Sequence, residues 1–135
     1  MNIDDVKDSL VERDGLSRSL GIEFFSTSDA ATCGARMRVD ERNCQPSGLL
    51  SGGAMLAMAE HLAGVGSAAL CPGRLGLGIN VSGSHVRSVS VGGVVTAEAR
   101  LLHRGGTLHH WHVEVRNESG DLVSTVEVTN FMVDR

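Results

Sequence analysis

Aromatic residues are scarce in this sequence of 135 residues: three Phe and one Trp are all of them, and Tyr is absent. Lys7 is the single lysine, and the formal net charge is −4. A chain with no basic run and few rings to stack on bases is poorly suited to nucleic acid, so we expect no nucleic-acid partner. The core must be built from aliphatic and small residues, and the 17 Gly should let helix and sheet pack closely.

Long apolar runs are also missing, since crossing a bilayer takes about 20 consecutive apolar residues. The first residues, Met1–Asp5, are acidic and lack the basic start and apolar stretch of a signal peptide. Cys33, Cys44 and Cys71 are odd in number and widely spaced, which fits neither a disulfide framework nor a CxxC metal site. We therefore expect a cytoplasmic protein with free thiols and no membrane partner.

The length is that of one domain, and we expect residues 1–135 to form it. Ile3, Val6 and Leu10 have helical spacing, which predicts a short N-terminal helix that ends by Gly15. Alternating apolar residues between turn residues predict strands at 21–25, 32–39, 77–89, 94–103, 107–116 and 122–133.

Glycine pairs lie between the later strands. The first two strands should form a hairpin, and Gly92-Gly93 and Gly105-Gly106 have the spacing of hairpin turns. These turns predict that each of the later strands pairs with the next along the chain.

The segment 49–70 is small or apolar at nearly every position, and Glu60 is its only formal charge. No polar face remains at helical periodicity, which predicts a helix buried on all sides. In a chain of this size a sheet must then surround the helix. The order of elements predicts an α+β hotdog architecture, an antiparallel sheet of about six strands wrapped around one long central helix, with a short N-terminal helix.

Glu60 is a candidate catalytic residue. An ionised carboxylate inside an apolar helix is costly unless it is paired or neutralised. No Lys or Arg stands three or four positions away from it. Such acids are enriched at functional sites, although an arginine from the sheet or a solvated interface would also accommodate Glu60.

Ser51-Gly52-Gly53 stands at the predicted start of the long helix. Backbone N–H groups in the first turn of a helix have no partner within it, and glycine lets a ligand approach them. Gly52 and Gly53 are therefore candidates for binding a developing oxyanion. Tight packing of the helix entry against a strand is the structural alternative.

The two candidate groups cannot meet within one helix. Gly52 and Glu60 are eight residues apart, which is about 12 Å along a helix. Two antiparallel copies in a twofold dimer place the start of each helix near the middle of its partner. The spacing therefore predicts a site shared by two subunits, with Gly52 from one and Glu60 from the other.

The segment Gln45–Ala54 followed by Glu60 resembles the signature of the hotdog-fold acyl-CoA thioesterases. The most similar branch is the phenylacetate-degradation type, whose relatives include 4-hydroxybenzoyl-CoA and 1,4-dihydroxy-2-naphthoyl-CoA thioesterases. The resemblance extends over nearly the whole chain from residue 16 onward. Further matches lie at Ser84–Arg87, His103–Gly105 and Trp111.

The resemblance implies hydrolysis of an aryl- or medium-sized acyl-CoA without a metal or organic cofactor. Glu60 would act as nucleophile or as general base on water, and the Gly52 N–H would stabilise the oxyanion. Gln45 would contact the carbonyl or orient the water. The resemblance also implies a homo-oligomer, a dimer or a dimer of dimers.

Two positions depart from the pattern of this family. Ser51 stands where relatives have His, and it retains one hydroxyl donor but not the charge or reach of imidazole. Gly64 stands where relatives often have Ser or Thr, four residues after Glu60. Ser67, about two turns beyond Glu60 on a similar face, is a candidate to compensate for Gly64.

The resemblance places CoA binding on the later strands. The candidates are His85 and Arg87, then Arg104 and Thr107 around a glycine turn. Solvated strand ends are the structural alternative for each. We expect Arg87→Ala to raise KM more than it changes kcat.

Other functions compete with hydrolysis. A non-catalytic acyl-CoA-binding or regulatory hotdog domain would fit Ser51 and Gly64 but gives no reason for Glu60 and Gln45. A hotdog hydratase or dehydratase would want a His paired with an acid, and a structural oligomer leaves Glu60 unexplained. His110 and His112 share a strand face, but a polar sheet surface explains them better than a metal site does.

Overall fold

The computed structural model describes residues 1–11 and 15–135. Two short helices, α1 (Asp4–Val11) and α2 (Leu16–Leu20), precede the strands β1 (Ile22–Phe25) and β2 (Thr32–Arg38). The long helix α3 (Gly52–Leu70) comes next. The remaining strands are β3 (Arg74–His85), β4 (Val94–Arg104), β5 (Leu108–Arg116) and β6 (Leu122–Asp134).

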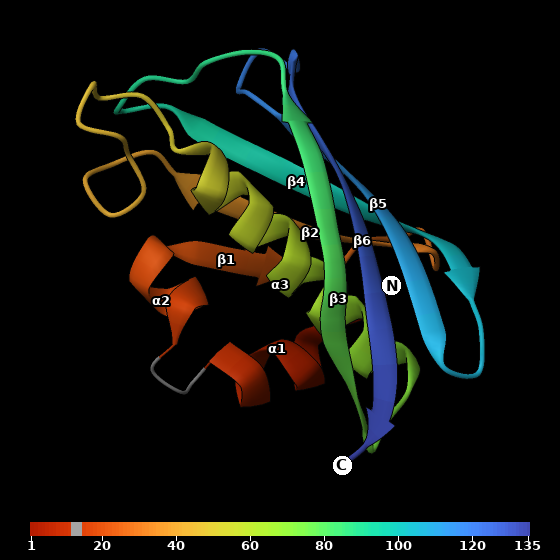
Figure 1. The fold of residues 1–135 in the computed structure, drawn as a ribbon. Helices are drawn as coiled ribbons and strands as arrows, with labels where there is room; N and C mark the ends of the chain where they lie inside the picture. The colour runs from red at the N-terminus through yellow and green to blue at the C-terminus, as the bar shows by residue number, and fades with distance from the viewer. Residues whose placement is uncertain (12–14) are drawn as a thin grey trace.

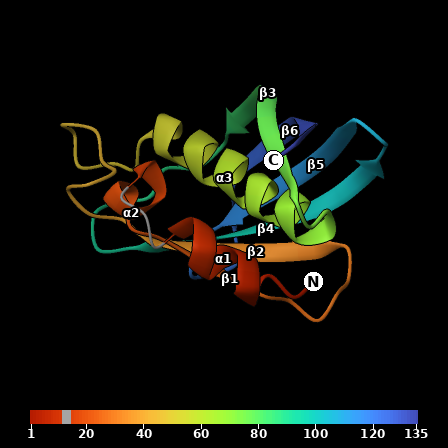
Figure 2. The same cartoon turned by 90° about the horizontal axis from the view of Figure 1, so that it is seen from below.

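The described strands form one six-stranded antiparallel sheet in the order β1-β2-β4-β5-β6-β3. The sheet curls around α3, which lies along its concave side (Figures 1 and 2). The predicted hotdog architecture is confirmed, as are the hairpins β1–β2 and β4–β5. Their apolar residues alternate with polar ones because only one face of the sheet meets the helix.

The third predicted strand differs from the structure in its bounds and its pairing. Strand β3 begins at Arg74 and ends at His85, and it pairs with β6 rather than with β4. The prediction of a hairpin turn at Gly92-Gly93 is wrong. Both glycines bond instead to Val39 beside the end of β2, with N···O distances of 2.8 and 2.9 Å. The pairing follows from the apolar faces that the strands present, which a turn motif does not reveal.

Helix α3 is covered less completely than its composition predicts. Its buried residues include Met58, Ala59 and Leu62, which face the sheet. Glu60 and His61 are only partly buried, and Gly53 is exposed. The prediction of burial on all sides is therefore wrong for a single chain, because the sheet and the two short helices cover only part of the helix surface.

The N-terminal helices lie beside α3 on the concave side of the sheet (Figure 2). The predicted first helix is confirmed as α1, while its predicted end before Gly15 falls on residues 12–14, outside the described residues. Helix α2 is an element that the sequence pattern does not predict. It is five residues long, too short for hydrophobic periodicity to reveal.

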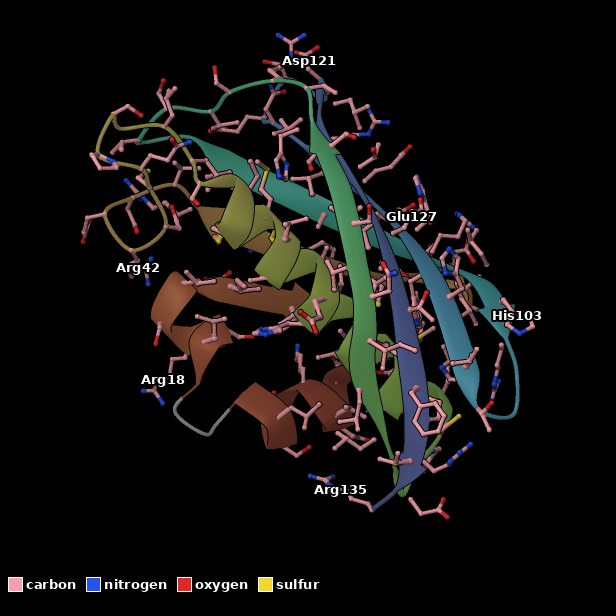
Figure 3. The ribbon with its side chains drawn as sticks, viewed as in Figure 1. Arg18, Arg42, His103, Asp121, Glu127 and Arg135 are labelled. Atoms are coloured by element: carbon pink, nitrogen blue, oxygen red, sulfur yellow. The ribbon has the colours of Figure 1, made fainter. Side chains whose placement is uncertain are left out.

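The convex face of the sheet carries polar side chains. His110 and His112 on β5 both bond to Glu127 on β6. The bond to Glu127 is the main cause that raises the pKa of His112. Figure 3 shows Glu127 and His103 on the side of the sheet away from α3. No group of three or more His, Cys, Asp or Glu among the described residues is placed to hold a metal ion.

The three cysteines are free, as the sequence predicts. Cys33 lies in the core, where burial raises the pKa of its thiol to about 12. The thiol is therefore protonated and unreactive at neutral pH. None of the helices in the described part of the chain has the length and apolar character needed to cross a membrane.

Ser67 is the centre of a buried polar network between α3 and the sheet. Its hydroxyl oxygen accepts hydrogen bonds from Trp111 Nε1 and from Asn130 Nδ2, each at 3.0 Å. The hydroxyl proton is then left to donate to His109 Nδ1 at 2.9 Å. Burial lowers the pKa of His109, in keeping with a neutral ring that accepts this bond.

We expect Ser67→Ala to destabilise the fold. The change leaves the buried polar groups of Trp111, Asn130 and His109 without their partner, so the free energy of unfolding should fall by at least about 2 kcal/mol. Urea denaturation at fixed protein concentration measures this. Ser119→Ala, in an exposed turn, is the control, and a similar small change in both variants would contradict the network.

Candidate functional site

The start of α3 presents free backbone donors. Ser51 precedes the helix with extended dihedrals, φ −70° and ψ 134°, and its side chain forms no capping bond. Among the described residues, the N–H groups of Gly52 and Gly53 have no acceptor, because the first helical bonds run from Ala54 and Met55 to the Ser51 carbonyl. Two donors at the positive end of the helix dipole are thus available to an anion.

A pocket of about 360 Å³ brings four predicted site residues together. Gln45 comes from the loop before α3, Gly52 from the helix start, and His85 and Arg87 from the end of β3 and the loop after it. The structure therefore brings four of the ten predicted site residues together at one end of the helix. The rest of the lining is Leu49, Leu50, Met55, Val86 and Ser88.

The ring of His85 packs directly on the first turn of α3. A Cβ atom at position 52 would lie 2.7 Å from ring atoms of His85, so this contact requires glycine. Ser124 Oγ donates to the Ser84 carbonyl at 3.1 Å and must accept from His85 Nδ1 at 2.8 Å. Nδ1 of His85 therefore carries a proton, and in the neutral tautomer Nε2 is a hydrogen-bond acceptor beside Gly52.

The carboxylate of Glu60 lies against the inner face of β3. A Cβ atom at position 78 would come within 2.2 Å of Glu60 Oε1, so the absence of a side chain at Gly78 makes room for the carboxylate. The register of β3 against β6 also shifts between Gly78 and Asn80. Glu60 has no hydrogen bond or ion pair to any described residue. Its side chain is half-buried.

Glu60 is not part of the pocket at the helix start. Gly52 and Glu60 are eight positions apart in one uninterrupted helix, so the two groups are about 12 Å apart along its axis. Within a single chain, Gly52 and Glu60 are therefore as far apart as the sequence predicts.

Ser51 and Gly53 face a different neighbourhood from Gly52. They line a second pocket of about 290 Å³ between α2 and α3, together with Leu16 and Leu20. Ser51 therefore does not lie in the pocket that holds Gln45.

The structure does not bring the remaining predicted residues to either of these two pockets; they are Arg104, Thr107 and Ser67. The Arg104 guanidinium bonds to the Leu70 carbonyl at 2.8 Å, at the far end of α3, where it satisfies the last turn. Thr107 is exposed in the turn that follows β4. The hydroxyl of Ser67 is committed to the core network, so it does not replace a side chain missing at Gly64.

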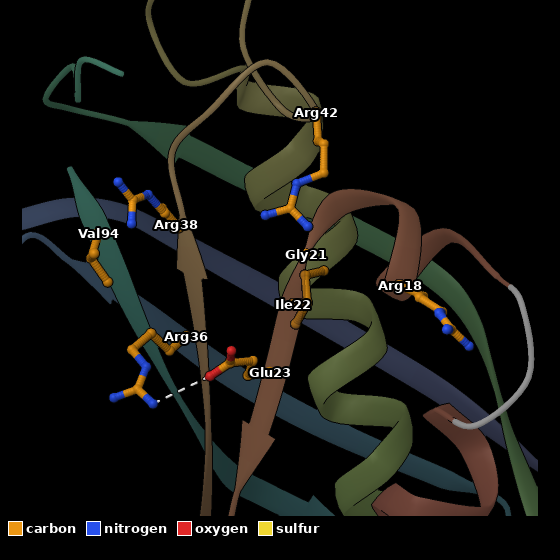
Figure 4. Close-up of a pocket in the computed structure, with 8 residues that line it drawn as sticks. All are labelled: Arg18, Gly21, Ile22, Glu23, Arg36, Arg38, Arg42 and Val94. Carbon is orange, nitrogen blue, oxygen red and sulfur yellow. Dashed lines mark hydrogen bonds and ion pairs between the residues drawn. The ribbon is translucent and has the colours of Figure 1, made fainter. Parts of the chain in front are cut away.

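A larger pocket of about 460 Å³ lies elsewhere, at the β1–β2 end of the sheet. Figure 4 shows Arg36, Arg38 and Arg42 around it. Arg36 pairs with Glu23 at 3.3 Å, and Arg42 pairs with Asp40 at 2.7 Å. Carboxylates next to these arginines thus offset much of their charge, and none of the predicted site residues lines this pocket.

Two features next to Glu60 were not predicted from the sequence. Nothing in the local sequence distinguishes Gly78, because its contact with Glu60 forms only in the folded chain. His61 Nδ1 shares a hydrogen bond with Ser17 Oγ from α2. Burial lowers the pKa of His61, and the charge of Glu60 opposes this effect.

Comparison with known proteins identifies the family of this chain. Residues 47–124 match the model of the thioesterase superfamily. A Deinococcus radiodurans protein named as an esterase is 46% identical over 116 residues, covering 84% of this chain and 71% of that protein. The 1,4-dihydroxy-2-naphthoyl-CoA hydrolase of Listeria monocytogenes is 31% identical over 110 residues, covering 81% and 88%.

The solved structures agree as well. A variant of a Pseudomonas aeruginosa thioesterase superposes with a TM-score of 0.88 at 30% identity, covering all of this chain and 96% of that one. The residues that match the superfamily model include the start of α3 and Glu60. The chain belongs to the thioesterase superfamily with the hotdog fold and is a thioester hydrolase.

Proposed function

We propose that this protein hydrolyses an acyl-CoA thioester at a site completed by a second copy of the chain. The observation that carries the proposal is the separation of the two halves of the site. The helix start offers free N–H donors with Gln45, while the unpaired carboxylate of Glu60 lies about 12 Å further along α3.

The free edge of β3 supports the second copy. Strand β3 ends the sheet and, among the described strands, pairs only with β6. Its side chains are mostly exposed, Ile79 by 60%. An exposed strand edge with apolar residues favours pairing with another chain. Antiparallel pairing of two β3 strands around a twofold axis also sets the two α3 helices antiparallel, with Gly52 of one facing Glu60 of the other.

In this arrangement the thioester carbonyl oxygen accepts hydrogen bonds from Gly52 N–H and from the Gln45 amide. Glu60 of the other subunit attacks the carbonyl carbon, or removes a proton from a water that attacks it. Both routes break the carbon–sulfur bond, consume one water and release a free acid and the CoA thiol. The helix donors stabilise the oxyanion that develops in either case.

His85 and Arg87 are placed for the CoA arm because they line the same pocket as Gly52. His85 Nε2 accepts an amide N–H of the pantetheine, and Arg87 attracts the phosphates. Arg104 and Thr107 lie at the other end of α3, so they remain predictions for a more distant part of CoA. Between an aryl and a medium-sized acyl group, the name of the Listeria monocytogenes relative supports the aryl group.

Glu60→Gln tests the chemical step. The amide keeps the size of the side chain but cannot attack or take a proton, so kcat should fall at least about a hundredfold. Thiol release from a panel of aryl-, phenylacetyl- and fatty acyl-CoAs measures it. If neither protein releases thiol although both bind acyl-CoA, the chain is a non-catalytic acyl-CoA-binding domain and the proposal fails.

A heterodimer with two separate defects tests the shared site. Gly52→Pro removes the N–H donor, and proline suits the first helical position after the extended Ser51. Gly52→Ala introduces the same Cβ beside His85 but keeps the donor, so it is the control. Each homodimer of Gly52→Pro or Glu60→Gln should be nearly inactive.

The heterodimer of these two variants, purified with two affinity tags, should recover about half of the wild-type rate. One of its two sites then combines an intact Gly52 with an intact Glu60. No recovery would place both groups of a site in one subunit and contradict the shared arrangement.

Arg87→Ala tests the place of CoA. Loss of a contact made equally in the ground state and the transition state should raise KM about tenfold and leave kcat nearly unchanged. Initial rates over a range of acyl-CoA concentrations provide both constants, and Arg116→Ala, an exposed arginine at the end of β5, is the control. A fall in kcat at constant KM would remove Arg87 from the CoA site.

A further inference from the structure

A cavity of about 180 Å³ lies between α3, β3 and the N-terminal helices. Leu10 of α1 and Phe24 of β1 line it opposite Val65 of α3. Its wall is mainly apolar and draws on five elements of the fold. The remaining lining residues are Ser17, His61, Gly64, Leu75 and Gly76.

The cavity begins next to Glu60. The carboxylate of Glu60 contacts the backbone at Gly78. The two glycines that line the cavity are near neighbours of these residues, one on α3 and one on β3. Gly64 follows Glu60 by one helical turn, and Gly76 precedes Gly78 by two residues on the same face of β3. A molecule whose carbonyl carbon lies beside Glu60 can therefore extend into the cavity.

Gly64 keeps this space open. A Cβ atom at position 64 would have no atom within 4 Å, so the position points into open space and not into packed atoms. The departure from the Ser or Thr of relatives thus has a structural consequence, which is more room beside the acid.

Ser17 and His61 are the polar part of the cavity wall. The hydroxyl of Ser17 and His61 Nδ1 share a hydrogen bond, which fixes the imidazole ring. His61 Nε2 has no hydrogen-bond partner among the described residues. Burial keeps the ring neutral, so Nε2 either donates or accepts according to the tautomer. A hydroxyl group, which can both donate and accept, matches either form.

We propose that this cavity receives the end of the acyl group remote from the thioester, and that His61, oriented by Ser17, recognises a hydroxyl group there. This inference rests on the proposed hydrolysis at Glu60. It makes His61 and Ser17 determinants of specificity, contributed by α3 and by the short helix α2. The acyl group is then compact and carries a hydroxyl at its far end.

Benzoyl-CoA and its three ring-hydroxylated forms test the inference because each differs by one hydroxyl. The wild-type protein should favour one hydroxylated form over benzoyl-CoA about tenfold in kcat/KM. In His61→Phe, which keeps the ring but loses the nitrogens, this ratio should fall to about one. His61→Gln retains a polar group and should recover part of the preference.

His110→Phe, on the convex face of the sheet, is the matched control and should keep the wild-type ratio. Calorimetric dissociation constants for the same four compounds provide the second readout. A ratio that His61→Phe does not change, or no wild-type preference in either readout, overturns the inference and leaves hydrolysis intact. Failure of the protein to release thiol from any acyl-CoA overturns the proposed function, and the binding ratio still decides the role of His61.

Discussion

The contact between the Glu60 carboxylate and the backbone of β3 at Gly78 is the constraint on which the site depends. Any side chain at position 78 would occupy the space of the carboxylate. With glycine there, the acid lies at the free edge of the sheet, half-buried and without a partner among the described residues. A buried acid with an ion-pair partner would be structural, whereas an acid held beside an open edge can act on another molecule.

The length of α3 determines the rest of the arrangement. A straight helix holds its N-terminal donors and Glu60 at a distance that one substrate carbonyl cannot bridge. Gly52 at the helix start admits the ring of His85 and keeps the backbone donors accessible. In the arrangement that we propose, the helix carries two half-sites, and a second copy of the chain supplies what each half lacks.

The departures from the family pattern have different consequences in this fold. Ser51 lines the pocket beside α2 and not the pocket that holds Gln45. Gly64 opens space next to the acid, and Ser67 fills none of it because its hydroxyl is used inside the core. The three positions therefore have different surroundings in the fold, which their residue types alone do not reveal.

Periodicity and turn chemistry predicted most of the strands, because alternation along β5 follows directly from a sheet with one buried face. Which strands pair with one another was harder to predict from the sequence. Gly92-Gly93 has the composition of a hairpin turn, yet it lies beside the end of β2 and bonds to Val39, while β3 pairs with β6. Helix α2 was missed because five residues hold too few apolar positions to show a period.

By itself, the sequence determined the helix that carries Glu60, the glycines at its start and the separation between them, since these depend on local composition and on the rise of a helix. Tertiary structure alone decided that Gly78 lies beneath Glu60, that Ser67 is turned into the core and that Ser17 reaches His61. Those contacts join residues distant in the chain. Their geometry follows from how the sheet curls around the helix, which no local pattern encodes.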